Sequence, residues 1–300
     1  MKRRMMVAAG AAVLLALTGC ASGGSLDGSG ETSGSADGSI TIGSANFSEN
    51  VLLAHIYAEA LNDAGFTSTV KPNIGSREVV IPALQDGSID IVPEYSGALL
   101  AYLDAESQVF ESQEVIDALG DALPEGLAML EASEAEDKDT LVVTRAMADE
   151  HGLTEIGDLA ALAPEFVLGG PPENKDRRAG VTGLRELYGL EFQQFKSVDL
   201  GGPLTVAGLN NGDLDVGFMF TTQPAIDEND FVALEDPEHM ALAENIVPVL
   251  RADRDDPKIT AALETVSRAL TTEALITMNR EVEVDKQDPQ KVARAFVDSL

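Results

Sequence analysis

The sequence predicts an α/β protein with two lobes, each built around a parallel β-sheet. Strand and helix patterns alternate from residue 39, and about 260 residues follow that point, which is more than one hydrophobic core usually takes. A phrase of 13 residues also occurs twice, ALQDGSIDIVPEY at 83–95 and GLNNGDLDVGFMF at 208–220. Because both phrases share the positions of Leu, Gly, Asp and a final aromatic, they indicate equivalent segments in two similar lobes.

The chain begins with an export signal that precedes the folded part. The basic residues KRR are followed by an apolar stretch, 5–17, shorter than the roughly 20 residues that a membrane-spanning helix needs. The stretch leads into LTGC, which resembles the lipobox of bacterial lipoproteins, where the cysteine is acylated and the chain is cut just before it. We therefore expect a signal peptide at 1–19, lipidation of Cys20 and a location at the cell membrane on its extracytoplasmic face. The alternative is that Cys20 merely ends the apolar segment.

The composition predicts the character of the segment after the signal and argues against some classes of binding partner. Residues 20–38 are mostly Gly, Ser and small acidic residues, which predicts a flexible tether. Cys20 is the single cysteine, so an exported chain forms no internal disulfide. Without KRR the chain has 17 Lys and Arg against 51 Asp and Glu, a formal charge of −34. This charge argues against nucleic acid and anionic headgroups as partners, and it also serves solubility.

The first half of the folded part reads as alternating strands and helices. Ile alternates in SITIGSA, and the apolar spacing that follows it has a helical period, with Ser48 placed as a cap and Gly65 as the stop. The expected elements are a strand at 39–45, a helix at 51–65, a strand at 67–73, a helix within 74–87 and a strand at 88–95. A strand that runs into a helix leaves free backbone N–H groups at its carboxyl end, where small ligands bind in α/β folds.

The second half repeats the alternation. Single helices between strands predict right-handed βαβ units and parallel sheets. The expected elements are a strand at 140–146, helices within 147–163, a strand and loop at 165–173, a helix at 180–189, a strand at 192–199, a helix at 203–213 and a strand at 214–222.

The repeated phrase can be placed on these elements. In each copy a helix ends, a Gly provides the left-handed stop, and a buried strand delivers an aromatic residue at its far end. We expect these aromatics, Tyr95 and Phe220, to face each other across a cleft between the lobes. Chance recurrence of a helix-Gly-strand phrase is the alternative.

Several segments resemble one protein family. ITIGSANFSEN, GSREVVIPALQDGSIDIVPEYSGAL, FTTQPAI, FVALEDPEH, NIVPVLR and the tail TTEALITMNREVEVDKQDPQKVARAFV are similar to the substrate-binding lipoproteins of osmoprotectant ABC transporters, which bind glycine betaine, carnitine or choline. The similarity covers nearly everything after residue 39.

The resemblance implies a two-lobed periplasmic-binding-protein fold of type II, with two crossover strands near 140–145 and 245–251. The first lobe is then expected at 39–141 plus 250–300, and the second at 142–249. The lobes are expected to close on a ligand and present it to a permease and ATPase complex, and the protein is expected to be a monomer.

The family holds quaternary ammonium groups with aromatic rings, each of which contributes about 0.5–2 kcal/mol. The tyrosine of its PEYSG segment is present as Tyr95. The aromatic before its Ser/Thr-Thr pair is present as Phe220, which precedes Thr221 and Thr222. The resemblance implies that these four residues contact the ligand.

Two further ring positions are occupied by other residues. The tyrosine of the first crossover falls on Leu141, after Asp139 and Thr140, and the tyrosine of the second falls on Glu244. Acidic groups in place of rings exchange cation–π attraction for charge pairing. A cation with N–H donors, or a larger polar solute, then becomes an alternative to the family's usual ligands.

Polar residues at the strand ends complete the predicted site. Asn46 and Asn50 flank the first strand-to-helix turn, where they would line the cleft or bind a carboxylate, and Ser76 occupies the next turn. Its neighbour Arg77 is expected in a surface salt bridge, or on a ligand carboxylate. The loops 169–171 and 201–203 suit close approach of backbone to a ligand, or are plain turns.

The sequence does not predict an enzyme, a metal site or a cofactor. Its three histidines are isolated, and it contains no HExxH, no GxSxG elbow and no P-loop. We therefore expect a solute-binding lipoprotein of an ABC importer, for glycine betaine, choline or carnitine. The alternatives are the same fold with an amino acid or a polyamine-like solute, or an envelope sensor that does not serve transport.

Overall fold

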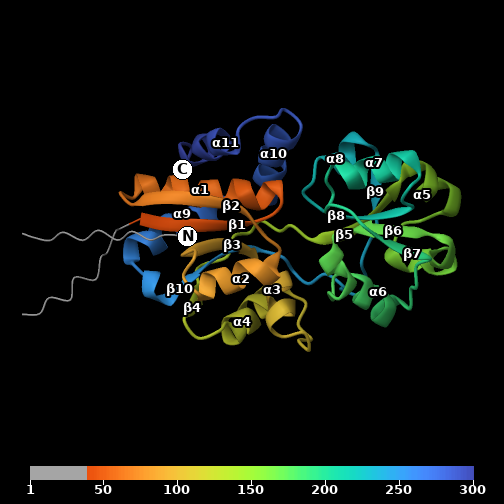
Figure 1. Cartoon of the computed structure of the whole chain (residues 1–300), viewed down its shortest axis with the longest axis horizontal. Helices are drawn as coiled ribbons and strands as arrows, with labels where there is room; N and C mark the ends of the chain where they lie inside the picture. Colours follow the sequence, from red (N-terminus) through yellow and green to blue (C-terminus); the bar gives the residue numbers. More distant parts are fainter. Residues whose placement is uncertain (1–38) are drawn as a thin grey trace, which may run out of the picture. The chain divides into compact units, whose positions relative to one another are not determined.

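Each lobe is built around a five-stranded sheet, in a computed structural model that describes residues 39–300 (Figure 1). The expected signal peptide, tether and Cys20 lie outside the described residues. The first sheet has the order β2-β1-β3-β10-β4, with β1 Ser39–Ala45, β2 Thr67–Gly75, β3 Ile91–Tyr95, β4 Leu127–Met129 and β10 Ile246–Arg251. The second has the order β7-β6-β8-β5-β9, with β5 Asp139–Thr144, β6 Val167–Gly170, β7 Gln194–Ser197, β8 Val216–Phe220 and β9 Phe231–Ala233.

One strand in each sheet runs against its neighbours. β1 pairs in parallel with β2 and β3, whereas β10 is antiparallel to β3 and β4. β6 pairs in parallel with β7 and β8, whereas β5 is antiparallel to β8 and β9. The prediction of wholly parallel sheets is therefore wrong at β5 and β10. Both strands enter their sheet directly from the other lobe, so no crossover helix sets their direction.

Helices cover both faces of the first sheet. One face packs against α1 Ser48–Asp63, α9 Pro257–Ala269, α10 Thr272–Glu283 and α11 Pro289–Val297, and their shared core includes Ile42, Leu53 and Leu263. The other face packs against α2 Arg77–Gln85, α3 Ser96–Leu103 and α4 Ser112–Ala122, around Leu84 and Leu99. Because both faces are covered, the central strand β3, with the sequence IVPEY, is buried at every position.

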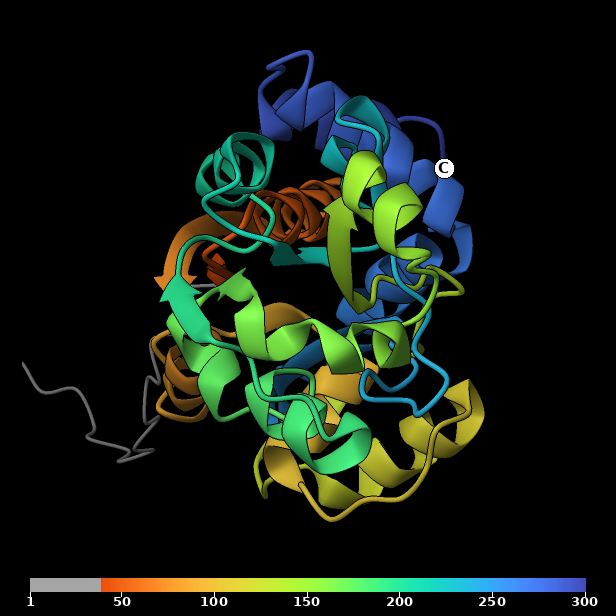
Figure 2. The same cartoon turned by 90° about the vertical axis from the view of Figure 1, so that its right-hand side faces the viewer.

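The second sheet is covered in the same way. α5 Arg145–His151 and α6 Val181–Tyr188 pack with the 3₁₀ turn Ile156–Ala161 on one face, around Phe218. α7 Pro203–Asn211 and α8 Ala225–Glu228 pack on the other, around Met219. Further 3₁₀ turns are Ala163–Glu165, Pro172–Lys175 and Ala252–Arg254. Figure 2 turns this lobe toward the reader, and α8 lies beside α10, where Arg280 pairs with Glu228 at 2.8 Å.

Two chain segments that connect the lobes pair with each other. Ser133 and Asp137 donate backbone N–H bonds to the carbonyls of Ile246 and Glu244, at 2.8 and 3.1 Å. The predicted lobe limits at 141/142 and 249/250 fall inside β5 and β10, each of which belongs wholly to one sheet. The strand limits therefore favour slightly earlier crossings than those that the family resemblance suggests.

Both copies of the repeated phrase adopt the predicted form. α2 ends before Gly87 (φ 80°) and leads to the buried strand β3, whose last residue is Tyr95. α7 ends at Gly212 (φ 74°) and leads to β8, whose last residue is Phe220. The expected helix-Gly-strand order is thus confirmed in each lobe.

Candidate functional site

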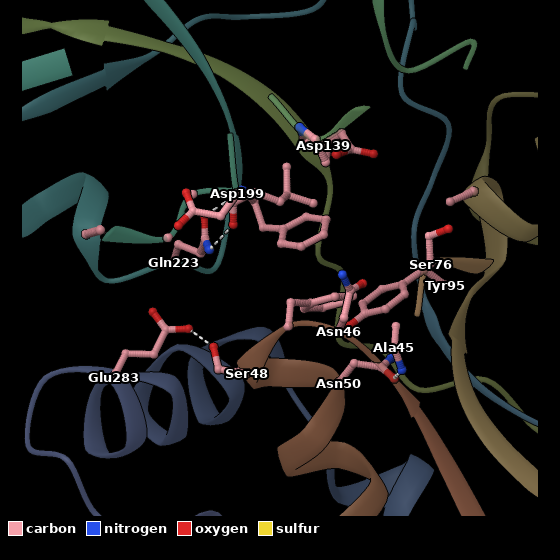
Figure 3. Close-up of a pocket in the computed structure, with 18 of the residues that line it drawn as sticks. Ala45, Asn46, Ser48, Asn50, Ser76, Tyr95, Asp139, Asp199, Gln223 and Glu283 are labelled. Atoms are coloured by element: carbon pink, nitrogen blue, oxygen red, sulfur yellow. Dashed lines mark hydrogen bonds between the residues drawn. The ribbon is translucent and has the colours of Figure 1, made fainter. Parts of the chain in front are cut away.

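A cavity of about 790 Å³ lies between the lobes, at the carboxyl ends of β1, β3 and β8 (Figure 3). Its walls come from the turn before α1, the first turn of α2, the start of β5, and the loops before α7 and after β8. Of the two loops that the sequence analysis singled out, 169–171 contributes Pro171 to the wall and 201–203 contributes all three residues. Residues distant in the chain therefore meet in one cleft with both polar and apolar surfaces.

Three aromatic rings form the apolar part of this wall. Tyr95 and Phe220 lie nearly parallel, with ring centroids 6.2 Å apart and an interplanar angle of 12°. Phe47 packs against both, at 5.8 Å from Tyr95 and 4.8 Å from Phe220. The expected pair thus faces each other, and a third ring joins it. The sequence reasoning missed Phe47, although it lies between Asn46 and Ser48 in the turn that was considered.

Two carboxyl groups, Asp139 and Glu244, lie in the cavity wall, and one of them is opposite a ring. Asp139 is directly opposite Phe220 across the β5–β8 pair, so the two side chains are neighbours on one face of the sheet. Glu244 precedes β10 and its Oε2 accepts a hydrogen bond from the backbone N–H of Ala98, three residues after Tyr95, at 3.0 Å. Both carboxyls line the cavity. The Oδ1 atom of Asp139 is buried without a hydrogen-bond partner among the described residues.

Burial changes the protonation of these carboxyls. It raises the pKa of Asp139 to about 6, against the opposing charges of Arg177 and Arg77. Burial, reinforced by the charge of Asp139, raises the pKa of Glu244 to about 8. At neutral pH Glu244 therefore carries a proton and Asp139 is ionised.

Basic side chains in the wall are already paired with acidic partners. Arg77 donates from Nε and Nη2 to the carboxylate of Glu94 at 2.7–3.1 Å, and Glu94 is buried whereas Arg77 is partly buried. The expected salt bridge of Arg77 is therefore present, but it lies in the cleft wall because its partner is on β3. Arg177 makes a similar two-pronged contact with Glu78.

A buried network behind the rings joins the two lobes. Glu49 in the first turn of α1 accepts hydrogen bonds from Tyr95 Oη at 2.8 Å, Thr222 Oγ1 at 2.6 Å and Asn279 Nδ2 at 2.5 Å. Thr222 also donates its backbone N–H to Asp137, in a segment between the lobes, and its hydroxyl oxygen lies 2.8 Å from the same carboxyl oxygen. Burial, together with the charge of Glu49, raises the pKa of Asp137 well above its ordinary value. The network therefore links Tyr95 and the segment after Phe220 to one shared residue, Glu49.

The structure gathers seven of the expected site residues in the cavity wall: Asn46, Asn50, Ser76, Tyr95, Asp139, Phe220 and Glu244. The polar atoms of Asn50 are occupied by backbone, because Oδ1 accepts from Ala45 N and Nδ2 donates to Pro93 O. The other four do not line the cavity: Leu141 is in the second lobe's core, Thr140 is buried in β5, Thr221 is exposed and accepts a hydrogen bond from Lys138 N, and Thr222 joins the network.

The start of α1 also differs from expectation. The helix begins at Ser48 with Phe47 at the N-cap position, so Ser48 does not cap it. Its hydroxyl instead donates to Glu283 at the end of α10. Glu49 and Glu283 were not found by sequence reasoning, and the acidic composition explains why, since 51 carboxylates hide individual ones.

Comparison with known proteins gives a consistent result. Residues 38–299 match the family model described as the substrate binding domain of an ABC-type glycine betaine transport system. A glycine-betaine-binding protein of Pseudomonas aeruginosa is 26% identical over 272 residues, which is 86% of each chain. The glycine betaine-binding protein YehZ of Escherichia coli is 24% identical over 86% of this chain and 89% of its own length.

The fold is shared with solved structures. A crystal structure described as a glycine betaine/carnitine/choline ABC transporter superposes with a TM-score of 0.68 at 20% identity, covering 87% of this chain and 98% of the other. The expected two-lobed periplasmic-binding-protein fold of type II is therefore confirmed. None of the helices within residues 39–300 has the length and apolar character needed to cross a membrane.

Proposed function

Because the chain belongs to the family of substrate-binding domains of ABC-type glycine betaine transport systems, we propose that it is the solute receptor of an ABC importer. It binds a small osmoprotectant with a methylated ammonium head, of the glycine betaine, choline or carnitine type, in the interlobe cleft. The ligand stabilises the closed arrangement by contacting both lobes and is then delivered to the permease and ATPase.

The observation that supports this proposal is the ring cluster of Phe47, Tyr95 and Phe220. A quaternary ammonium has no N–H to donate, so a protein attracts it with the negative faces of aromatic rings, each worth about 0.5–2 kcal/mol. The cluster draws Phe47 and Tyr95 from the first lobe and Phe220 from the second. A ligand held among them contacts both lobes at once, as closure requires.

We further propose that the receptor is held at the extracytoplasmic face of the cell membrane by a lipid on Cys20, and that the segment 20–38 is its tether. The basis is the sequence pattern KRR, apolar stretch and LTGC. Cell fractionation is the measurement: the wild-type protein is expected with the membranes and a Cys20→Ser variant away from them. Membrane association that is equal in the two would remove the lipid anchor from the proposal.

Binding is tested with the purified protein in thermal-shift and calorimetric titrations against glycine betaine, choline, carnitine, polyamines and amino acids. A ligand at 100 times its Kd is expected to add about 2.7 kcal/mol to the stability. Tyr95→Ala and Phe220→Ala are each expected to weaken the same ligand at least tenfold. Tyr102→Ala is the matched control, because Tyr102 is an exposed aromatic on α3.

Two results would contradict the proposal. The first is a transition temperature that no small solute changes. The second is a ligand whose affinity is the same for wild type, Tyr95→Ala and Phe220→Ala. A response to polyamines alone would instead support the second candidate, a receptor for multiply charged amines, which the acidic groups Glu94, Asp139 and Glu244 in the cavity wall favour.

A further inference from the structure

We propose that the cleft selects a net cation whose second polar group donates a hydrogen bond, as in an amino alcohol such as choline, and that it discriminates against zwitterions such as glycine betaine. The inference rests on the proposed function, because it names the ligand class of the same cleft. Asp139 is the residue that makes the selection.

The cavity has no uncommitted basic side chain for a ligand carboxylate among the described residues. Arg77 is bound to Glu94 through both Nε and Nη2. Arg177 is bound in the same two-pronged way to Glu78. Lys286, at the other end of the cavity, donates to the backbone carbonyl of Glu283. A ligand carboxylate would therefore meet arginines whose positive charge is already balanced by a resident acidic group.

The helix ends that face the cavity also hold resident carboxylates. At α7, Asp199 accepts the backbone N–H groups of Leu204 and Thr205, at 3.0 and 2.9 Å. At α3, Glu244 accepts the N–H of Ala98. At α1, Glu283 accepts the hydroxyl of Ser48, the first helical residue. Helix amino ends are the usual backbone sites for anions, and here protein side chains already occupy that role at α3 and α7 and sit beside α1.

Acceptors, by contrast, remain available beside the rings. Asp139 has a buried Oδ1 without a partner among residues 39–300, and its side chain reaches the cavity near the ring cluster (Figure 3). A buried polar atom without a partner is unfavourable, so a ligand donor that reaches Asp139 satisfies an existing deficit.

The charges of the cavity wall also favour a cationic ligand. The charges of Arg77 and Glu94 cancel within their ion pair, and Glu244 is protonated at neutral pH because its pKa is about 8. Asp139 is left with an uncompensated negative charge. A ligand with a single positive charge neutralises it, whereas the carboxylate of a zwitterion adds a negative charge to the same wall.

The position of Asp139 suits a short amino alcohol. Asp139 and Phe220 are directly opposite each other in an antiparallel pair, where Cβ atoms are about 4.5–5.5 Å apart. The short chain that joins the two polar groups of an amino alcohol can therefore span the distance from the ring of Phe220 to the carboxylate of Asp139. A methylated ammonium on the rings therefore places a nearby hydroxyl within reach of Asp139.

Isothermal titration of the purified protein with choline and glycine betaine at pH 7.5 tests the proposal. The two probes share a trimethylammonium head and differ in bearing a donor or an acceptor. Choline is expected to bind at least tenfold more tightly. Asp139→Asn is expected to weaken choline at least tenfold and to leave glycine betaine unchanged or improved. Asp117→Asn, on the exposed face of α4, makes the same change in net charge and is expected to alter neither affinity.

Each other outcome has a distinct meaning. If glycine betaine binds as tightly as choline or more tightly, the proposed function stands and the selection for a donor-bearing cation is overturned. If Asp139→Asn weakens choline no more than Asp117→Asn does, Asp139 is not the selecting residue and the inference also fails. If neither probe binds, the proposed function fails with it. The comparison of the two probes on wild type needs no variant, so it decides the question even if Asp139→Asn does not fold.

Discussion

The two lobes deliver their aromatic rings by the same local device. Asp90 precedes β3 and Asp215 precedes β8, and each exchanges two hydrogen bonds with the strand beside it. Asp90 N–H donates to the carbonyl of Thr41 and its Oδ2 accepts the N–H of Thr41, while Asp215 makes the same two bonds with Val167. The resemblance between the phrases is therefore one of hydrogen bonding as well as spacing, which chance recurrence does not explain.

The lobes differ in how the delivered ring is held. Tyr95 is fixed through its hydroxyl to Glu49, whereas Phe220 has no polar atom and is positioned by its contacts with Phe47 and by its strand. The carboxyl groups beside the rings differ as well, because Glu244 has a higher pKa than Asp139. The first lobe thus presents a ring anchored through its hydroxyl, and the second presents a packed ring opposite the carboxyl of Asp139.

The largest expected effect is a pH dependence that separates the two carboxyls. Burial raises the pKa of Glu244 from 4.5 to about 8, so the folded state holds the proton more tightly and stability is lost as the pH rises through that window. The loss amounts to roughly 4–5 kcal/mol above pH 8 for Glu244. For Asp139, whose pKa rises from 3.8 to about 6, it is roughly 3 kcal/mol and is complete above pH 6.

Urea unfolding of wild type, Glu244→Gln and Asp139→Asn at pH 5, 7 and 9 measures the loss of stability that each carboxyl causes. Glu244→Gln is expected to match wild type at pH 5 and to exceed it by several kcal/mol at pH 9. The difference in stability between Asp139→Asn and wild type is expected to reach its full size by pH 7. Identical profiles for the two variants would mean that the carboxyls titrate as one unit, and the contrast between the lobes would be lost.

A second prediction concerns the anchor of the first ring. Glu49→Ala removes the acceptor shared by Tyr95, Thr222 and Asn279. The Tyr95 hydroxyl then has no partner, whereas Thr222 can still donate to Asp137 and Asn279 to Thr222. With about 1–3 kcal/mol for an unpaired buried donor and a smaller loss at the other two groups, the free energy of unfolding is expected to fall by roughly 2–3 kcal/mol.

Glu49→Gln is the shape-matched control and should lose less, because its amide oxygen still accepts. Tyr95→Phe, which removes one of the three donors, should lose about 1 kcal/mol. Denaturation curves give all three values. A loss for Glu49→Ala no larger than that for Tyr95→Phe would show that the network does not depend on Glu49.

Much of the architecture is predictable from local patterns. The strands and helices through residue 222 follow from apolar spacing and from stops such as Gly87 and Gly212, because each side of a buried strand or an amphipathic helix has a fixed period. The strand directions of β5 and β10 are not predictable in this way. These directions depend on where the chain crosses between the lobes. That is a property of the tertiary structure, and it leaves no periodic pattern in the local sequence.

The site residues likewise fall into those that a local pattern reveals and those that depend on long-range contacts. Tyr95, Phe220, Asp139 and Glu244 could be singled out because they end recognisable strands or fall on ring positions of a known family. Leu141 and Thr222 were expected on the ligand but lie away from the cavity, because Leu141 is two residues further into β5, within the second lobe's core, and Thr222 is in the turn after β8, where it joins the buried network. Glu49 could not be identified, since its importance comes from partners up to 230 positions away.

The smallest expected effect compares the two glycine turns. Gly87 and Gly212 both have positive φ, so an alanine at either is strained by about 1–2 kcal/mol. A Cβ on Gly212 meets nothing within 4 Å, whereas one on Gly87 would lie 2.2 Å from Nη1 of Arg251. Since Arg251 pairs with Asp253 and lies 3.9 Å from Asp90, its displacement adds a further cost. Gly87→Ala is therefore expected to lose about 1 kcal/mol more than Gly212→Ala in urea unfolding, and equal losses would show that Arg251 moves freely and that the two turns are energetically alike.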